Sequence, residues 1–327
     1  MIWSAGKKLK NGLYTIEGQP IGHGRLSLTY LAKTKEGNRI VIKVPNDEAS
    51  QVDLERVQGR FVKEAFKLQQ CQHPHIVKVF DPFQEEHLWC IPMEYVAGMT
   101  LDKRDRRRLS EVEAITYVTQ IGEALTVLHG KNLIHRDVNP SNVILRVREG
   151  KSEAVLIDFG LVRDFSTDAS SVTTHTQAGD MMPSYKAPEL YVPNGDRGPF
   201  CDLYALGAML YELVTGDLPP NAIERSEKPG PLSFPGNGVS ERVIKSIESA
   251  MAMKASGRPD SVAEWLEQLD SGKFPDVTPE STPRKPINWK MVITVITAIT
   301  GLVTAGTGMI SAFQPKDSSP KPSEKTR

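Results

Sequence analysis

The stretch "LIHRDVNPSN", from Leu133 to Asn142, places the carboxylate of Asp137 and the amide of Asn142 five residues apart. A second aspartate, Asp158 of "LIDFG", follows Asp137 by 21 residues. Phosphoryl transfer needs a metal that neutralises charge and a carboxylate that orients the attacking hydroxyl group. Together the two motifs indicate a site that positions phosphate groups for transfer.

Upstream, "IGHGRLSLTYLA" presents Gly22 and Gly24 between two strand-like runs. Backbone N–H groups can approach phosphates where side chains are absent, although a Gly-x-Gly pair in a hairpin is more often a simple turn. Nineteen residues after Gly24, Lys43 stands inside the apolar strand "IVIKV", where a buried ammonium group needs an anion. The helix predicted around 54–70 then supplies Glu64.

The order of the predicted elements divides the chain. The first forty or so residues alternate apolar and polar side chains, and "IVKVFDPF" and "LWCIPMEYV" indicate two more strands after the helix. Beyond Gly98 the pattern becomes helical, with Ser110 and Glu113 forming a capping box. We therefore expect an α+β fold in which a small β-rich part precedes a larger helical part.

These motifs, followed by "APEL", resemble in kind and order those of Hanks-type (eukaryotic-like) bacterial serine/threonine protein kinases. The resemblance implies a two-lobed kinase domain over 13–270, with an N-lobe at about 13–96 and a C-lobe at about 97–270. Residues 1–12 would be an N-terminal extension. The resemblance also implies ATP and Mg²⁺ (or Mn²⁺) as cofactors and proteins as substrates.

The same resemblance assigns roles to single residues. Lys43 would hold the α- and β-phosphates and pair with Glu64, and Asp137 would be the catalytic base. Asn142 would have a catalytic role and would hold the metal together with Asp158. The ATP-binding residues would be Ile21, Gly22, Gly24, Thr29, Val41, Lys43, Met93, Glu94, Val96 and Ile144.

Three further residues have structural roles in this resemblance. Glu189 of "APEL" and Arg258 of "GRPD" would form an ion pair outside the catalytic chemistry. Asp202, near the start of a long apolar helix, would brace the catalytic loop.

The chain also departs from the family pattern. Ser27 and Val41 replace a glycine and a small alanine around the nucleotide, and Asn139 and Met182 replace a lysine and its threonine partner. Loss of one cation near the γ-phosphate would remove about 1–4 kcal/mol of charge stabilisation, which is roughly a ten- to thousand-fold slowing. We expect a slow enzyme. The alternative is a pseudokinase that serves as a membrane-anchored ATP-binding or scaffolding module.

The C-terminal part has a different composition. Residues 271–290 form a Pro-rich linker, 291–313 contain no charged residue, and 314–327 form a short polar tail. An uncharged helix of 23 residues is long enough to span a bilayer. We expect a single transmembrane helix at the cell membrane, with the kinase domain in the cytoplasm because ATP is there. Small residues that recur along one stripe of this helix predict a homodimer; they are Thr294, Thr297, Gly301, Thr304, Gly308 and Ser311.

Two polar segments carry further hypotheses. "STDASSVTTHTQ" lies where activation loops lie, and Thr173, Thr174 and Thr176 are candidate phosphorylation sites that Arg136 would meet. "DKRDRRR", residues 102–108, could select acidic substrates or touch anionic lipids, although a solvated charged loop is the more common reading.

Composition limits the remaining possibilities. Lys+Arg and Asp+Glu both number 40, so no overall charge favours nucleic acid as a partner. The three cysteines, Cys71, Cys90 and Cys201, are scattered and fit a reducing compartment.

Overall fold

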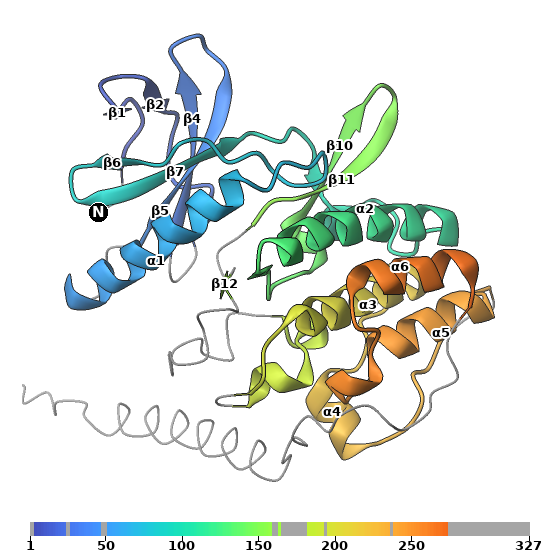
Figure 1. Cartoon of the computed structure of the whole chain (residues 1–327). Coiled ribbons are helices and arrows are strands. Elements are labelled where there is room, and N and C mark those ends of the chain that lie inside the picture. Colours follow the sequence, from blue (N-terminus) through green and yellow to red (C-terminus); the bar gives the residue numbers. More distant parts are fainter. Residues whose placement is uncertain are drawn as a thin grey trace, which may run out of the picture. The chain divides into compact units, whose positions relative to one another are not determined.

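The computed structural model describes residues 3–23, 27–46, 51–158, 163–164, 182–192, 195–235 and 238–273 (Figure 1). The predictions for Gly24, for Thr173, Thr174 and Thr176, and for the linker beyond Lys273 and the span lie outside these residues. Within the described ranges, no helix combines the length and the apolar character that a membrane crossing requires.

The N-terminal lobe is a seven-stranded sheet with one long helix against it (Figure 1). The strand order is β1-β2-β4-β5-β7-β6, and β3 pairs with β4. Its elements are β1 (Lys8–Leu9), β2 (Tyr14–Ile16), β3 (Gly22–His23), β4 (Ser27–Thr34), β5 (Arg39–Pro45), α1 (Gln51–Gln69), β6 (Phe83–Glu85) and β7 (Leu88–Glu94).

Alternation along the strands explains this sheet. On β4, Leu28, Tyr30 and Ala32 are buried, while the residues between them are half-buried. Successive side chains on a strand point to opposite faces, so the buried set forms an apolar core on one face. Ile42 of β5 belongs to the same core. The opposite face of the sheet does not belong to this core and can contribute side chains to a binding site.

The C-terminal lobe is mostly helical. Its helices are α2 (Glu111–Gly130), α3 (Pro199–Thr215), α4 (Ala222–Glu227), α5 (Glu241–Ala250) and α6 (Val262–Ser271). Its strands are β8 (Met99–Thr100), β9 (Leu133–Ile134), β10 (Val143–Arg148), β11 (Lys151–Leu156) and β12 (Arg163–Asp164). Short 3₁₀ helices are η1 (Leu101–Lys103), η2 (Pro140–Asn142), η4 (Pro183–Tyr185), η5 (Pro188–Tyr191) and η6 (Ala255–Gly257).

Helix α3 is the centre of this lobe, and it packs against α2 and α5. Nearly all of its side chains are buried, as the apolar "DLYALGAMLYELVTG" run predicts. A Cβ atom at Gly207 would lie 2.6 Å from the Cβ of Ala250, so glycine permits the close approach of α3 and α5. The predicted capping box of Ser110 and Glu113 is present at the start of α2.

The two-lobed α+β fold predicted from the sequence is confirmed. One difference concerns the segment expected to be an extension. Strand β1 pairs with β2, and Trp3 is buried with its backbone N–H donating to the Tyr30 hydroxyl at 3.1 Å. Residues 3–12 therefore pack as part of the N-lobe.

Candidate active site

The loop after β9 is fixed to the core by one buried carboxylate. Asp202 of α3 is fully buried and accepts the backbone N–H groups of His135 at 2.8 Å and Arg136 at 2.7 Å. His129 Nε2 contacts the same carboxylate at 2.8 Å. Burial alone would raise the pKa of Asp202, but the hydrogen bonds and charges of His129 and His135 hold that pKa below its ordinary value.

Arg136 has a left-handed backbone with a φ of 67°, which is uncommon for a residue other than glycine. Its N–H donates to Asp202, so the bond to α3 stabilises the unusual conformation. The expected bracing role of Asp202 is therefore visible as three contacts to the loop and α2.

Asp137 lies between two amide side chains. Asn142 Nδ2 donates to Asp137 Oδ2 at 2.8 Å and to its backbone oxygen at 2.8 Å. Asn139 Nδ2 donates to Asp137 Oδ1 at 2.9 Å. Each oxygen of the predicted catalytic base thus accepts a hydrogen bond from a neutral donor, which fixes the plane of the carboxylate.

The environment of Asp137 raises its pKa to about 6. Burial is the main cause, and the nearby charge of Asp158 adds to it, while the bonds from Asn142 and Asn139 and the charge of Lys43 oppose it. A carboxylate with this pKa accepts a proton more readily than an exposed aspartate does, which suits a general base.

Lys43 of the N-lobe contacts Asp158 of the C-lobe. Its Nζ atom lies 2.5 Å from Asp158 Oδ1, although the two residues are 115 positions apart in the chain. Lys43 is buried, whereas 46% of the Asp158 side chain is exposed. The other expected partner of Lys43, Glu64, lies half-buried on α1, which packs against β5 and β7.

Strand register gathers the predicted nucleotide-binding residues on one face. Thr29 is paired with Lys43, and Val41 with Met93. Cross-strand partners project to the same side of a sheet, and so do residues two apart on one strand. Thr29, Val41, Lys43 and Met93 therefore lie on the face opposite the apolar core of the N-lobe. The Lys43–Asp158 contact shows that this face is turned toward the catalytic loop.

Other predicted nucleotide contacts surround this face. Gly22 pairs with Thr29 across β3 and β4, and a Cβ atom at Gly22 would lie 3.3 Å from the Thr29 Cβ. Ile21 is 61% exposed at the edge, and Val96 is buried where the chain leaves β7. Ile144 lies on β10, opposite Thr100 of β8.

Sequence reasoning missed Gly98. A Cβ atom there would lie 2.1 Å from the backbone oxygen of Leu145 and 2.8 Å from Ile144 Cγ2. Only glycine lets the segment after β7 approach β10 this closely, so Gly98 sets the position of Ile144 relative to Val96. The position of this glycine directly after "EYVA" was the available signal.

The donor set fits a hard divalent cation. Because Asn142 uses its Nδ2 atom to hold Asp137, its Oδ1 atom is the part of the amide that can serve as a metal ligand. Asp158 offers a partly exposed carboxylate. Among the described residues, no group of three His, Cys, Asp or Glu side chains could hold a metal ion. Mg²⁺ is commonly bound by one or two protein oxygens together with phosphate oxygens, so Asn142 and Asp158 fit this ion.

The departures from the family pattern have different environments. Asn139 is 2% exposed and bonded on both sides, whereas Met182 is 47% exposed at the start of η4. The charged segment 102–108 is mostly exposed, but some of its arginines form ion pairs within the C-lobe. Arg104 pairs with Glu212 at 3.0 Å and Arg107 with Asp217 at 3.3 Å. The side chains of Arg104 and Glu212 are mostly buried, which favours a structural role for Arg104, whereas the Arg107 side chain is 78% exposed.

The predicted Glu189–Arg258 ion pair is present. The guanidinium forms two bonds to the carboxylate, at 2.7 and 3.0 Å, and also donates to the backbone oxygens of Phe200 and Ala252. The pair joins η5 to the segment after η6, away from Asp137 in the chain and without contact to it.

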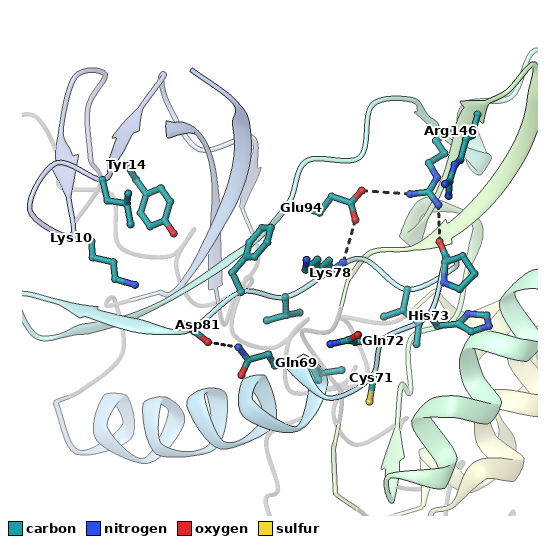
Figure 2. Close-up of a pocket in the computed structure, with 17 residues that line it drawn as sticks. Lys10, Tyr14, Gln69, Cys71, Gln72, His73, Lys78, Asp81, Glu94 and Arg146 are labelled. Carbon is teal, nitrogen blue, oxygen red and sulfur yellow. Dashed lines mark hydrogen bonds and ion pairs between the residues drawn. The ribbon is translucent and has the colours of Figure 1, made fainter. Parts of the chain in front are cut away.

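A separate cavity of about 670 Å³ lies beside Glu94, at the end of β7 (Figure 2). Its lining contains none of Lys43, Asp137, Asn142 and Asp158. Figure 2 shows that the carboxylate of Glu94 faces this cavity, where it accepts the Lys78 N–H at 3.4 Å. The side chain of Glu94 is thus directed away from the nucleotide face described above.

Residues 15–232 match the family model of the protein kinase domain. The chain therefore belongs to the protein kinase family. It is 33% identical over 284 residues to the serine/threonine-protein kinase PkaA of Streptomyces coelicolor, covering 82% of this chain and 48% of that protein. It is 32% identical to the Aurora/IPL1-related protein kinase 2 of Caenorhabditis elegans, covering 64% of this chain and 67% of that protein.

A probable serine/threonine-protein kinase of Clostridium perfringens is 33% identical over 80% of this chain and 38% of its own length. The chain thus spans about half the length, or less, of the bacterial relatives it matches. Among solved structures, the apo form of PpkA-294 matches with a TM-score of 0.64 and 22% identity, over 82% of this chain and 99% of that chain. This last likeness supports the fold alone.

Proposed function

We propose that this chain transfers the γ-phosphoryl group of ATP to serine or threonine residues of proteins, including its own segment between the Asp158 motif and "APEL". The observation that supports this most is the geometry around Asp137. Its carboxylate is oriented by two amides on a loop anchored to α3, and the Lys43–Asp158 pair joins the N-lobe to the segment that follows β11.

In this proposal, bound ATP supplies the phosphoryl group and Mg²⁺ (or Mn²⁺) neutralises its charge. Lys43 would exchange its contact with Asp158 for the α- and β-phosphates, and Asp158 and Asn142 would hold the metal. The Asp137 carboxylate would orient the substrate hydroxyl and accept its proton as the oxygen attacks phosphorus. The raised pKa of Asp137 is consistent with that proton transfer.

The test uses purified full-length protein with Mg²⁺ and γ-³²P-labelled ATP. We expect ³²P incorporation on serine or threonine, mapped by mass spectrometry, and none above background in Asp137→Asn. This variant keeps the size of the side chain and removes the base. Wild type that binds ATP but incorporates no more ³²P than Asp137→Asn would support the pseudokinase alternative.

We further propose that residues 291–313 anchor the chain in the cell membrane with the kinase domain in the cytoplasm. The support is the sequence, which has no charged residue over 23 positions there. Full-length protein should sediment with membranes after a carbonate wash, and a chain ending at residue 273 should remain in the supernatant. Equal distribution of the two would contradict the anchor.

A further inference from the structure

Asn139 occupies the position where the family resemblance leads one to expect a lysine, and its side chain forms hydrogen bonds of its own. It is 2% exposed, and both ends of its amide are bonded within the catalytic loop. These contacts are the starting point for an inference about its role.

The nitrogen of this amide contacts the catalytic residue. Asn139 Nδ2 lies 2.9 Å from Asp137 Oδ1 and 3.1 Å from the Asp137 backbone oxygen. Asn142 makes the equivalent pair of bonds to Oδ2 and the same backbone oxygen, both at 2.8 Å. The two amides hold the carboxylate from both sides. A carboxylate oxygen can accept two hydrogen bonds, so each oxygen keeps capacity for a substrate hydroxyl.

The oxygen of this amide caps the next helical turn. Asn139 Oδ1 accepts the Ser141 backbone N–H at 3.0 Å and the Ser141 hydroxyl at 2.5 Å, at the start of η2. A backbone N–H can only donate, so the amide oxygen must face Ser141 and the NH₂ group must face Asp137. The cap thereby sets which end of the amide meets the carboxylate.

We propose that Asn139 is a positioning residue that orients the Asp137 carboxylate for phosphoryl transfer. It does so as a neutral donor, held in place by its own cap on Ser141. A lysine could donate to Asp137 but could not accept a hydrogen bond from Ser141. Asn139 therefore lacks the charge of the expected lysine but bonds both Asp137 and Ser141. The inference rests on the proposed phosphoryl transfer, because positioning has a measurable effect only where the base is used.

The two ends of the bridge can be separated by substitution. Serine is a good N-cap residue, so Asn139→Ser can still accept the Ser141 N–H, but its hydroxyl is too short to reach the Asp137 carboxylate. Asn139→Lys can still donate to the Asp137 carboxylate but cannot accept the Ser141 N–H. Asn139→Ala loses both functions.

We expect Asn139→Ser to lower kcat about 10- to 100-fold, with the KM for ATP within about twofold of wild type, because misorientation of the base affects transfer and not nucleotide binding. Its Tm should stay near that of wild type. Asn139→Lys should lose about 2–4 °C in Tm through the lost cap and still retain more kcat than Asn139→Ser. Asn139→Ala should lose both.

The matched control is Asn221→Ser, which makes the same change at another capping asparagine. Asn221 accepts the Ile223 and Glu224 backbone N–H groups at the start of α4. Its kcat should equal that of wild type. All variants are made in the full-length chain, and ³²P incorporation and Tm are measured on the same preparations.

A wild-type kcat in Asn139→Ser would overturn the inference, as would a kcat that follows Tm across the Ser, Lys and Ala variants. In the latter case Asn139 would be structural only. Wild type without transfer above Asp137→Asn would overturn the proposed function and this inference together, whereas active wild type with an active Asn139→Ser would overturn the inference alone.

Discussion

Two ion pairs of this protein kinase domain differ in what surrounds them. Arg258 and Glu189 are almost fully buried, and the guanidinium is also bonded to backbone oxygens of Phe200 and Ala252. Lys43 is buried as well, but 46% of the Asp158 side chain is exposed. All partners of the Arg258–Glu189 pair come from the C-lobe, while the Lys43–Asp158 pair leaves the Asp158 carboxylate partly exposed. An ion pair whose charged groups are buried and fully hydrogen-bonded within the protein indicates a structural role. An ion pair with one exposed carboxylate indicates a carboxylate that can also bind a metal or another ligand.

The largest expected effect comes from breaking the structural pair. Arg258→Ala should destabilise the protein by about 3–5 kcal/mol, because Glu189 would remain buried without its partner. Urea unfolding followed by tryptophan fluorescence measures this loss. Arg258→Ala together with Glu189→Gln should recover part of it, and a loss below about 1 kcal/mol in the single variant would contradict the assignment.

Breaking the Lys43–Asp158 pair should have a different effect. Asp158→Asn should reduce phosphoryl transfer by roughly 1000-fold, about 4 kcal/mol in the barrier, because the metal loses an anionic ligand. The Tm should remain within a few degrees of wild type. A Tm loss as large as that of Arg258→Ala would show that the two pairs do not differ in the way described.

The Arg104–Glu212 pair is an intermediate case. Both side chains are mostly buried, and the Tyr185 hydroxyl donates to the same carboxylate. Arg104→Ala should cost about 2 kcal/mol of stability, since a buried, charge-assisted hydrogen bond is lost. The exposed Arg106, which pairs with Glu113, is the matched control, and Arg106→Ala should change stability by less than about 0.5 kcal/mol. Equal effects in urea unfolding would contradict the role of burial.

The smallest effect concerns the buried cation Lys186. Lys186 is 4% exposed and lies 4.1 Å from the ring centroid of Tyr191, and the described residues include no ion-pair partner for it. Burial, with a contribution from the charge of Arg197, lowers its pKa to about 8. Between pH 8 and the ordinary value of 10.5, the unfolded chain binds more protons at this site, so its contribution to stability rises with pH.

Lys186→Met should therefore stabilise the protein at pH 7, by about 1 kcal/mol after allowance for the lost contact with Tyr191. The gain should shrink as the pH rises from about 8 toward 10.5. Urea midpoints of both proteins at pH 7, 8.5 and 10 measure it. A difference that does not depend on pH would exclude Lys186 ionisation as its cause.

The sequence alone determined the kind of fold and most of the chemistry. Alternation along 13–45 predicts strands because one face of a sheet is apolar. The order of the motifs that contain Asp137, Asn142 and Asp158 resembles that of protein kinases, and this resemblance implies their roles toward phosphate and metal. Features that depend on residues close together in the chain can be predicted from the sequence. Ser110 and Glu113 are a further example, since a capping box needs only three residues of separation.

Only the tertiary structure decided which side chains meet. Lys43 contacts Asp158 across 115 residues, and Asp202 reaches the loop from α3 at a separation of more than 60. From the sequence Asn139 reads as a lost cation, but in the folded loop it bridges Asp137 and Ser141. The physical reason is that a hydrogen bond requires donor and acceptor within about 3 Å at a suitable angle. Residue type and spacing indicate which groups are available, whereas packing of the two lobes sets their distances.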